Sequence, residues 1–291
     1  MYIILFRQAE REGMDYILFS ERSGICMNAV HTLWNLPEGF DKNEEYSVLT
    51  MILSALMWRR HNGEITLVTD TKGKEAILKA GLGYVWNNIN TELDNIPKEI
   101  NPQVFWAAGK IYGLKNIKTP VVSIDTDFIV WKPLELEKLK SDICVIHRET
   151  LNRDIYPDVK PYTDFDDSFS WEILPCNTAF FYVNNSLFLK EYLSYADRFM
   201  RACREEDCLK PMVFAEQRLF SMIAEKMKIH IDTFSSVENL MNGDDDRFTH
   251  LWGYKSHLRK NPGEKDEFTE RLRNRLRKEF PDSFGKYTER I

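Results

Sequence analysis

Short apolar runs alternate with amphipathic segments along the first half of the chain. The runs have the length and the β-branched content of strands, and the segments between them have apolar positions at helical spacing. The predicted strands cover residues 28–34, 65–69, 84–86 and 120–124. The predicted helices cover residues 45–61, 72–80 and 105–112. Strands that alternate with helices over short loops predict an α/β domain with a mostly parallel central sheet flanked by helices.

The pattern becomes less regular after Pro133. Predicted strands cover residues 142–146, 179–183 and 229–231, and predicted helices cover residues 187–204, 215–226 and 264–280. Loops are expected over the acidic, aromatic stretch 156–169 and the Gly-Asp stretch 242–247. Apolar residues recur every four positions in the last helix, which makes it amphipathic. We therefore expect an N-terminal appendage over residues 1–26, one domain over 27–260 and a C-terminal amphipathic helix over 261–291.

The composition of the 291 residues excludes several classes of protein. Lys and Arg total 39 and Asp and Glu total 45, so the net charge of −6 gives no general attraction to nucleic acid. With 43% hydrophobic residues, and 7 Trp, 12 Tyr and 18 Phe, the chain is too apolar and too aromatic to be disordered. The five cysteines form no CxxC pair, which argues against a disulfide framework or a structural zinc site and favours reduced thiols.

The chain shows no segment typical of membrane insertion. The apolar run Met1–Phe6 is shorter than the roughly 7–15 residues of a signal peptide core, and no run approaches the roughly 20 residues of a membrane helix. We therefore expect a soluble, cytoplasmic protein. The basic stretch 271–278 allows a weak peripheral contact with the inner face of a membrane. The simpler interpretation, which we favour, is a solvated helix face that pairs with Glu264, Glu267 and Glu270.

Two carboxylates follow the most apolar strand of the chain. Asp125 and Asp127 lie two residues apart, so both side chains project to the same side of an extended segment at the carboxyl edge of the sheet. Such a pair suits a divalent cation, which takes carboxylate oxygens and keeps further positions for water or phosphate. The alternative is a pair of solvated turn aspartates, although carboxylates beside a buried strand are costly without a counter-charge.

Around this pair, residues 27–255 resemble glycosyltransferases of the GT-A fold, which use nucleotide sugars. The nearest likeness is to bacterial relatives of the glycogenin and lipopolysaccharide galactosyltransferase group, and to an uncharacterised bacterial family with the same DxD layout. The matching segments occur in the family's order. They are His31–Trp34, Leu67–Asp70, the Asp125–Asp127 pair, Cys176–Asn184, Glu216-Gln217 and His250–Lys255.

The resemblance implies a single GT-A-like domain and assigns a role to each matching residue. The implied metal ligands are Asp125, Asp127 and His250. The implied contacts to the nucleotide sugar are Thr32, Trp34, Asp70, Trp106, Lys110, Asp125 and Lys255, with Trp106 and Lys110 expected on one helix face. The implied catalytic residues are Glu216 and Asn177. Asp166, Asp167 and Asp244 are further carboxylates that could serve as a general base.

The implied function is a metal-dependent, hexosyltransferase-like enzyme of bacterial surface polysaccharide synthesis. It would use Mn²⁺ (or Mg²⁺), a UDP- or GDP-sugar donor and a glycan or lipid-linked acceptor. The chain departs from the family where Asn177-Thr-Ala replaces Asn-Ser-Gly and where Lys255 comes one residue early with no Pro-Trp after it. A non-catalytic relative that binds nucleotide or glycan is the main alternative. A sugar nucleotidyltransferase ranks lower, because residues 33–41 hold no basic, Gly-rich loop.

Each implied residue also has a simpler interpretation. Lys110 could be an ordinary exposed helix lysine, and His250 could be a core or surface histidine. Trp34, Trp106 and Trp252 are individually more typical of core packing than of ligand stacking. Glu216 could be a surface residue that complements a helix dipole.

Overall fold

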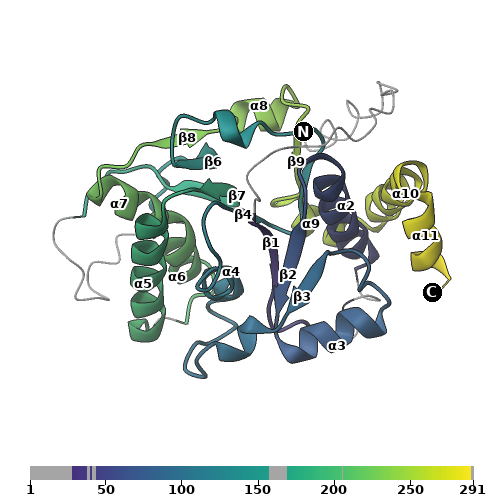
Figure 1. Ribbon diagram of the computed structural model, residues 1–291, viewed down its shortest axis with the longest axis horizontal. Helices are drawn as coiled ribbons and strands as arrows, with labels where there is room; N and C mark the ends of the chain where they lie inside the picture. The colour runs from purple at the N-terminus through teal and green to yellow at the C-terminus, as the bar shows by residue number, and fades with distance from the viewer. Residues whose placement is uncertain (1–27, 38–39, 41–43, 157–168, 205, 290–291) are drawn as a thin grey trace.

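The computed structural model describes residues 28–37, 40, 44–156, 169–204 and 206–289 (Figure 1). A seven-stranded sheet lies at its centre, with the strand order β3-β2-β1-β4-β7-β6-β8. Its strands are β1 (Asn28–Leu33), β2 (Ile65–Thr69), β3 (Asn88–Asn90), β4 (Val121–Ile124), β6 (Ile143–Arg148), β7 (Cys176–Val183) and β8 (Ile231–Thr233). A second sheet pairs β5 (Phe128–Val130) with β9 (Phe248–His250).

Helices cover both faces of the large sheet. They are α2 (Glu45–His61), α3 (Thr71–Lys79), α4 (Ala108–Gly113), α5 (Ser186–Ala202), α6 (Lys210–Val213), α7 (Leu219–Lys226), α8 (Val237–Asn242), α9 (Tyr254–Lys260), α10 (Pro262–Glu279) and α11 (Pro281–Thr288). The 3₁₀ turns η3 (Glu92–Asn95) and η4 (Leu136–Lys138) lie in loops, and the π-helical turn η6 (Phe214–Arg218) joins α6 to α7.

The sheet is mostly parallel, as the sequence predicts. β1 runs parallel to both β2 and β4, and β2 runs parallel to β3. β7 is antiparallel to β4 and to β6, and β8 is parallel to β6. Only β7 therefore runs against the rest of the described sheet. The carboxyl ends of β1, β2, β4 and β6 meet at one edge, where an α/β sheet binds its ligands.

Helices lie on both sides of the sheet (Figure 1), and each face has its own hydrophobic core. On one face, α2 lies between the sheet and α10, and it is apolar nearly all round, as expected for a buried helix. Phe268, Leu272 and Leu276 of α10 join this core. On the other face, α4, α5 and α7 pack over β1, β4 and β7.

The small sheet joins β5, which follows β4 in the chain, to β9 near the C-terminal end of the domain. Phe128 pairs with His250 in the antiparallel register of β5 and β9. A buried hydrogen-bond chain supports β5 from the core: Trp86 donates to His31 Nδ1, His31 Nε2 contacts Ser54 Oγ at 3.1 Å, and Ser54 donates to the Phe128 carbonyl. Because Trp86 donates to Nδ1, His31 carries its proton on Nε2.

Two predicted elements of the first half are misplaced. The segment 84–86, predicted as a strand, forms a turn, and Val85 and Trp86 pack into the core from it. The strand lies a little later, as β3, whose polar residues form the edge strand of the sheet. The helix expected over 105–112 begins only at Ala108, because residues 101–107 form turns in which Asn101 accepts a hydrogen bond from the Gln103 N–H. Trp106 therefore precedes the helix that carries Lys110, and the expected shared helix face does not exist.

In the second half, the predicted long strands and helices are present with shifted ends. The helix expected over 215–226 instead begins at Lys210 and passes through the π-helical turn η6. The short elements β5, β9, α8, α9 and α11 lack a periodic pattern of their own and were not predicted. The appendage over 1–26 and the loop residues 157–168, which include Asp166 and Asp167, lie outside the described residues. Asp244 is exposed in the turn after α8.

The basic stretch 271–278 is engaged within the protein. Arg273 pairs with Glu270, as expected, and also with Glu45 of α2. Arg275 pairs with Glu279, whereas Glu264, an expected partner, pairs with His257. The cations of Arg271 and Arg277 lie over aromatic rings of α10 and α11. As the solvated-face interpretation predicts, the basic residues pair with acidic residues of the same protein, although some of the partners differ from those expected. A peripheral membrane contact stays a prediction.

None of the described helices is both long enough and apolar enough to cross a membrane. The four described cysteines are free thiols, of which Cys144, Cys176 and Cys203 are buried and Cys208 is exposed.

The buried His31 makes stability depend on pH. Burial lowers its pKa to about 3, so the unfolded state binds a proton more readily than the folded state. Stability from the neutral imidazole is therefore complete above about pH 6.5 and is lost as the pH falls toward 3. Lowering the pH from 7 to 5 should remove about 2 kcal/mol through this residue. Urea unfolding at pH 7 and pH 5 measures the free energy of unfolding of the wild type and of His31→Gln. Between the two pH values, the wild type should lose about 2 kcal/mol more than the variant does. Equal losses in both proteins would contradict the prediction.

Candidate active site

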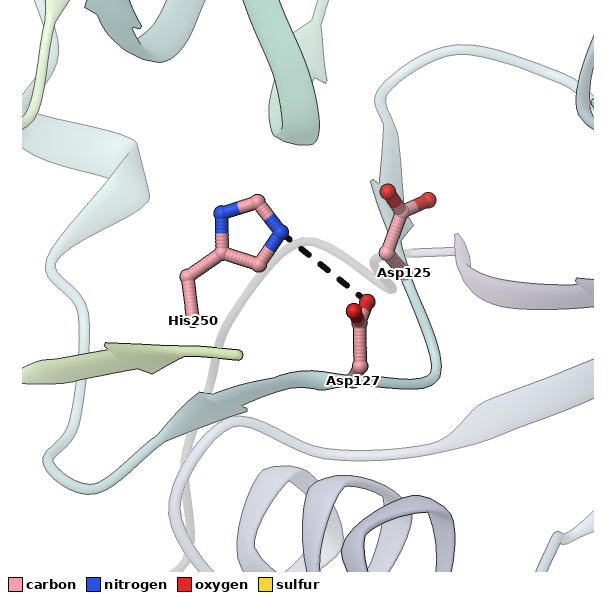
Figure 2. Close-up of side chains that lie close together, drawn as sticks. All are labelled: Asp125, Asp127 and His250. Atoms are coloured by element: carbon pink, nitrogen blue, oxygen red, sulfur yellow. Dashed lines mark ion pairs between the residues drawn. The ribbon is translucent and has the colours of Figure 1, made fainter. Parts of the chain in front are cut away.

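Three potential metal ligands converge at the carboxyl end of β4 (Figure 2). Asp125 and Asp127 lie in the turn between β4 and β5, and His250 ends β9. One ligand atom from each residue lies within 4.8 Å of the other two. The sequence predicted this group, and of the described residues it is the one set of three His, Cys, Asp or Glu with this geometry.

Backbone hydrogen bonds fix the turn that carries the two carboxylates. The Asp125 N–H donates to the Ala179 carbonyl of β7 at 2.7 Å, and the Phe128 N–H donates to the Asp125 carbonyl at 2.9 Å. The Leu251 N–H donates to the Asp127 carbonyl at 3.1 Å, which ties the residue after His250 to the turn. The large sheet thus positions Asp125, while the small sheet positions Asp127 and His250.

Two ammonium groups flank the carboxylates. Lys110 Nζ of α4 lies 2.6 Å from Asp125 Oδ1, and Lys255 Nζ of α9 lies 2.8 Å from Asp127 Oδ2. His250 Nε2 lies 3.9 Å from Asp127 Oδ1, the contact drawn in Figure 2. The site therefore joins residues that are far apart in the sequence.

Burial and charge set the protonation of the three potential ligands. Burial raises the pKa of Asp125 to about 7, with help from Glu216 and Asp127 and against Lys110. Burial also acts to raise the pKa of Asp127, but Lys255 and His250 outweigh it, and the pKa lies below its usual range. Burial lowers the pKa of His250 to about 4, so its imidazole is neutral at pH 7. A neutral imidazole is the form that binds a metal.

Lys110 is buried, with 4% of its surface exposed, and is not the exposed helix lysine of the simpler interpretation. Its ammonium contacts Asp125, Glu216 Oε1 and the Thr178 carbonyl. The Thr178 hydroxyl also donates to Glu216 Oε1 at 2.9 Å. Burial acts to lower the pKa of Lys110, but Asp125 and Glu216 raise it above its usual range. Glu216, also buried, lies in the π-helical turn, and such turns are frequent at functional sites.

Two glycines of α4 bring Lys110 to this position. A Cβ at Gly109 would lie 2.7 Å from Trp34 Cβ, and a Cβ at Gly113 would lie 2.9 Å from Thr32 Cγ2. The helix can therefore approach the end of β1 closely only because both positions lack a side chain. Thr32 and Trp34, expected to contact the nucleotide, lie at this α4–β1 contact and are partly buried.

Two further polar pairs involve β7 and the π-helical turn η6. The amide of Asn177, at the start of β7, donates to Glu149 Oε1 at 2.7 Å. The Tyr156 hydroxyl donates to Gln217 Oε1 at 2.7 Å. Asn177 and Glu216 are predicted site residues, and Gln217 belongs to the same matching segment as Glu216. Glu149 was not predicted, because its place after β6 follows only from the pairing of β6 with β7.

Asp70 and Trp106 have structural roles in this state. Asp70 is the N-cap of α3, where Oδ1 accepts from the Gly73 N–H at 2.6 Å and Oδ2 accepts from the Asn35 N–H at 2.9 Å. Trp106 is 53% exposed, and its indole N–H donates to the Cys208 carbonyl at 2.9 Å. These partners lie outside the Asp125–Asp127–His250 group, so the role of Asp70 and Trp106 toward a nucleotide stays a prediction.

The model of a family of unknown function, DUF6734, matches residues 27–290, so the chain belongs to this family. Among curated proteins no sequence matches the chain. Solved structures with a similar arrangement include mouse xyloside xylosyltransferase 1 in its apo form, at 12% identity and a TM-score of 0.42 over 72% of this chain and 84% of the other. An active-site mutant of LgtC aligns at 11% identity and a TM-score of 0.35 over 66% and 70%. The glycosyltransferase GlyE of Streptococcus pneumoniae TIGR4 aligns at 15% identity and a TM-score of 0.36 over 74% and 46%.

The close approach of α4 to β1 predicts a strong effect of one added methyl group. In Gly109→Ala the new Cβ meets Trp34 Cβ at 2.7 Å and Leu93 Cδ1 at 3.1 Å, so α4 must shift, at a cost of about 1–3 kcal/mol. The matched control is Gly285→Ala in α11, where a Cβ meets nothing within 4 Å and the better helix propensity of Ala should stabilise by up to about 1 kcal/mol. Urea unfolding of both variants measures the difference. Equal stabilities would show that α4 is not held at this distance.

Proposed function

We propose that this chain is a metal-dependent glycosyltransferase that transfers a sugar from a nucleoside diphosphate sugar to a hydroxyl acceptor. The observation that carries the proposal is the convergence of Asp125, Asp127 and His250 within 4.8 Å at the carboxyl end of β4. In an α/β sheet this edge is where nucleotides and other ligands bind.

The charges of the site fit a divalent cation. The carboxylates of Asp125, Asp127 and Glu216 face the two ammonium groups of Lys110 and Lys255. The neutral imidazole of His250 adds no charge at pH 7, so the ionised site has excess negative charge. Two carboxylates and an imidazole accept Mn²⁺ more readily than a site built only of oxygen ligands would, with Mg²⁺ as the second choice. When bound, such an ion would neutralise and hold the diphosphate as a Lewis acid.

Lys255 has the chemistry to stabilise the leaving group. Negative charge builds on the diphosphate as the bond to the sugar breaks, and a positioned ammonium stabilises that charge. Lys255 Nζ now pairs with Asp127, and about a third of its side chain is exposed. A cation held by Asp127 would take over that charge balance and leave Lys255 available for the diphosphate.

Glu216 and Asn177 are suited to hold the donor sugar. Oε1 of Glu216 already accepts from Lys110 and Thr178, which fixes the orientation of its carboxylate. Asn177 is fixed by Glu149 and by the Ala179 N–H. We assign both residues to orienting hydroxyl groups of the sugar. Glu149 is the more exposed carboxylate of this group and is our candidate for contact with the acceptor hydroxyl.

The finer parts of the proposal rest on the resemblance found in the sequence. These are a UDP- or GDP-sugar as donor, a glycan or lipid-linked acceptor, and a role in bacterial surface polysaccharide synthesis in the cytoplasm. Thr32, Trp34, Asp70 and Trp106 complete the proposed nucleotide contacts.

A panel of UDP- and GDP-sugars, with and without Mn²⁺, tests the proposal. The wild type should release nucleoside diphosphate from at least one donor only when Mn²⁺ is present. Asp127→Asn keeps the shape of the side chain but removes a charged metal ligand, so the rate should fall by at least about 100-fold. The matched control is Asp246→Asn, an exposed carboxylate paired with Lys132, which should change the rate by less than about twofold.

Three outcomes have different consequences. Absence of binding to every donor, with or without Mn²⁺, would overturn the proposal. Full activity in EDTA or in Asp127→Asn would exclude the metal role. Tight, Mn²⁺-dependent binding of a donor without release or transfer would favour the non-catalytic alternative.

A further inference from the structure

Trp252 has a strained backbone. Among the described residues, non-glycine positions with positive φ are Asn35, Lys228 and Trp252. Asn tolerates the left-handed region, and Lys228 follows Met227, the C-cap of α7, at a position where this conformation is common. Neither reason applies to Trp252, which adopts φ 44° before α9 although it is large. Strained residues of this kind cluster at functional sites, where the surrounding structure holds them in place.

Two imidazoles hold the Trp252 ring. The ring stacks on His250, with centroids 5.5 Å apart and planes 11° apart. It also contacts His147, with centroids 5.3 Å apart and planes 45° apart. The remaining surface is open, since 37% of the residue is exposed and a Cβ at the adjacent Gly253 would meet nothing within 4 Å. A large aromatic surface is therefore fixed and exposed beside a proposed metal ligand.

The sheet order places this ring on one particular side of the site. His147 lies on β6 and pairs with Asn177 of β7. β7 and β6 lie on the opposite side of β4 from β1 and β2. Thr32 and Trp34, two of the proposed nucleotide contacts, lie at the end of β1, whereas Lys255, the proposed diphosphate contact, follows Trp252 by three residues. Trp252 therefore lies on the β6–β7 side of the metal group, away from Thr32 and Trp34 at the end of β1.

We propose that the exposed part of the Trp252 ring is a stacking platform for a pyranose ring of the acceptor, so that the acceptor is a glycan. This inference rests on the proposed function and names its acceptor class. The C–H face of a pyranose is apolar and can cover the indole, while its hydroxyl groups remain at the rim for water or polar side chains. Because His250 and His147 already fix the indole, little side-chain entropy is lost on binding.

Direct binding of simple sugars tests the platform without relying on turnover. The probes are the methyl pyranosides of glucose, galactose, mannose and N-acetylglucosamine, with glycerol as a hydroxyl-bearing control, measured by saturation-transfer NMR. The variants are Trp252→Asn, whose new residue tolerates positive φ, and Trp252→Phe, which keeps a ring. At least one pyranoside should bind the wild type, bind Trp252→Asn about tenfold more weakly, and bind Trp252→Phe within about threefold of the wild type. Leu187→Ala, at an exposed leucine of α5, is the matched control and should bind as the wild type does.

A parallel titration with UDP and Mn²⁺ separates this inference from the proposed function. A platform for the acceptor leaves the affinity for UDP and Mn²⁺ within about threefold in both Trp252 variants. Loss of that affinity with unchanged pyranoside binding would overturn the inference, because the ring would then serve the nucleotide or the metal. Failure of every pyranoside to bind, or equal binding to wild type and Trp252→Asn, would also overturn it. Absence of UDP and Mn²⁺ binding to the wild type would instead count against the proposed function.

Discussion

The charge balance among buried carboxylates and ammonium groups is the constraint on which the site depends. Glu216 is buried and Asp125 and Asp127 are partly buried, and an unpaired charge is unstable where access to water is reduced. Lys110 joins Asp125 to Glu216, and Lys255 pairs with Asp127. Removal of Lys110 would leave the buried carboxylate of Glu216 without its cation, and removal of Lys255 would leave the partly buried Asp127 unpaired, which costs more than the pair contributes.

Each part of the fold around the site can be understood as a means of delivering one of these charges. Gly109 and Gly113 allow α4 to pack closely against the end of β1, which places Lys110 beside Asp125. The π-helical turn η6 directs Glu216 toward Lys110 while its neighbours anchor other segments: Gln217 contacts Tyr156, and Arg218 donates to the Ile173 carbonyl. The pairing of β5 with β9 brings His250, and α9 follows with Lys255. The site therefore depends on contacts between segments that are far apart in the sequence, as the sheet does.

Local pattern accounts for what the sequence could predict. Apolar strands and the helix α2 carry their own periodicity, and Asp125 and Asp127 follow the most apolar strand directly, so their place at the sheet edge could be predicted. Glu149 could not be found, because nothing near it in the sequence reveals that β6 lies beside Asn177. Tyr84–Trp86 was misassigned because apolar residues that fill a core from a turn look like a strand. His250 and Lys110 were identified through resemblance, and their burial and contacts required the structure.

Asp70 and Trp252 differ in whether the fold alone accounts for them. Asp70 matches a motif, yet both of its oxygens are used to cap α3 and to hold Asn35, so the fold alone explains a carboxylate there. Trp252 is the opposite case. Its backbone conformation would suit glycine, it is partly exposed, and its ring stacks on His250, a proposed metal ligand. The contacts with His250 and His147 explain how the ring is held in place, and the proposed acceptor contact accounts for the strained backbone and for the exposed part of the ring.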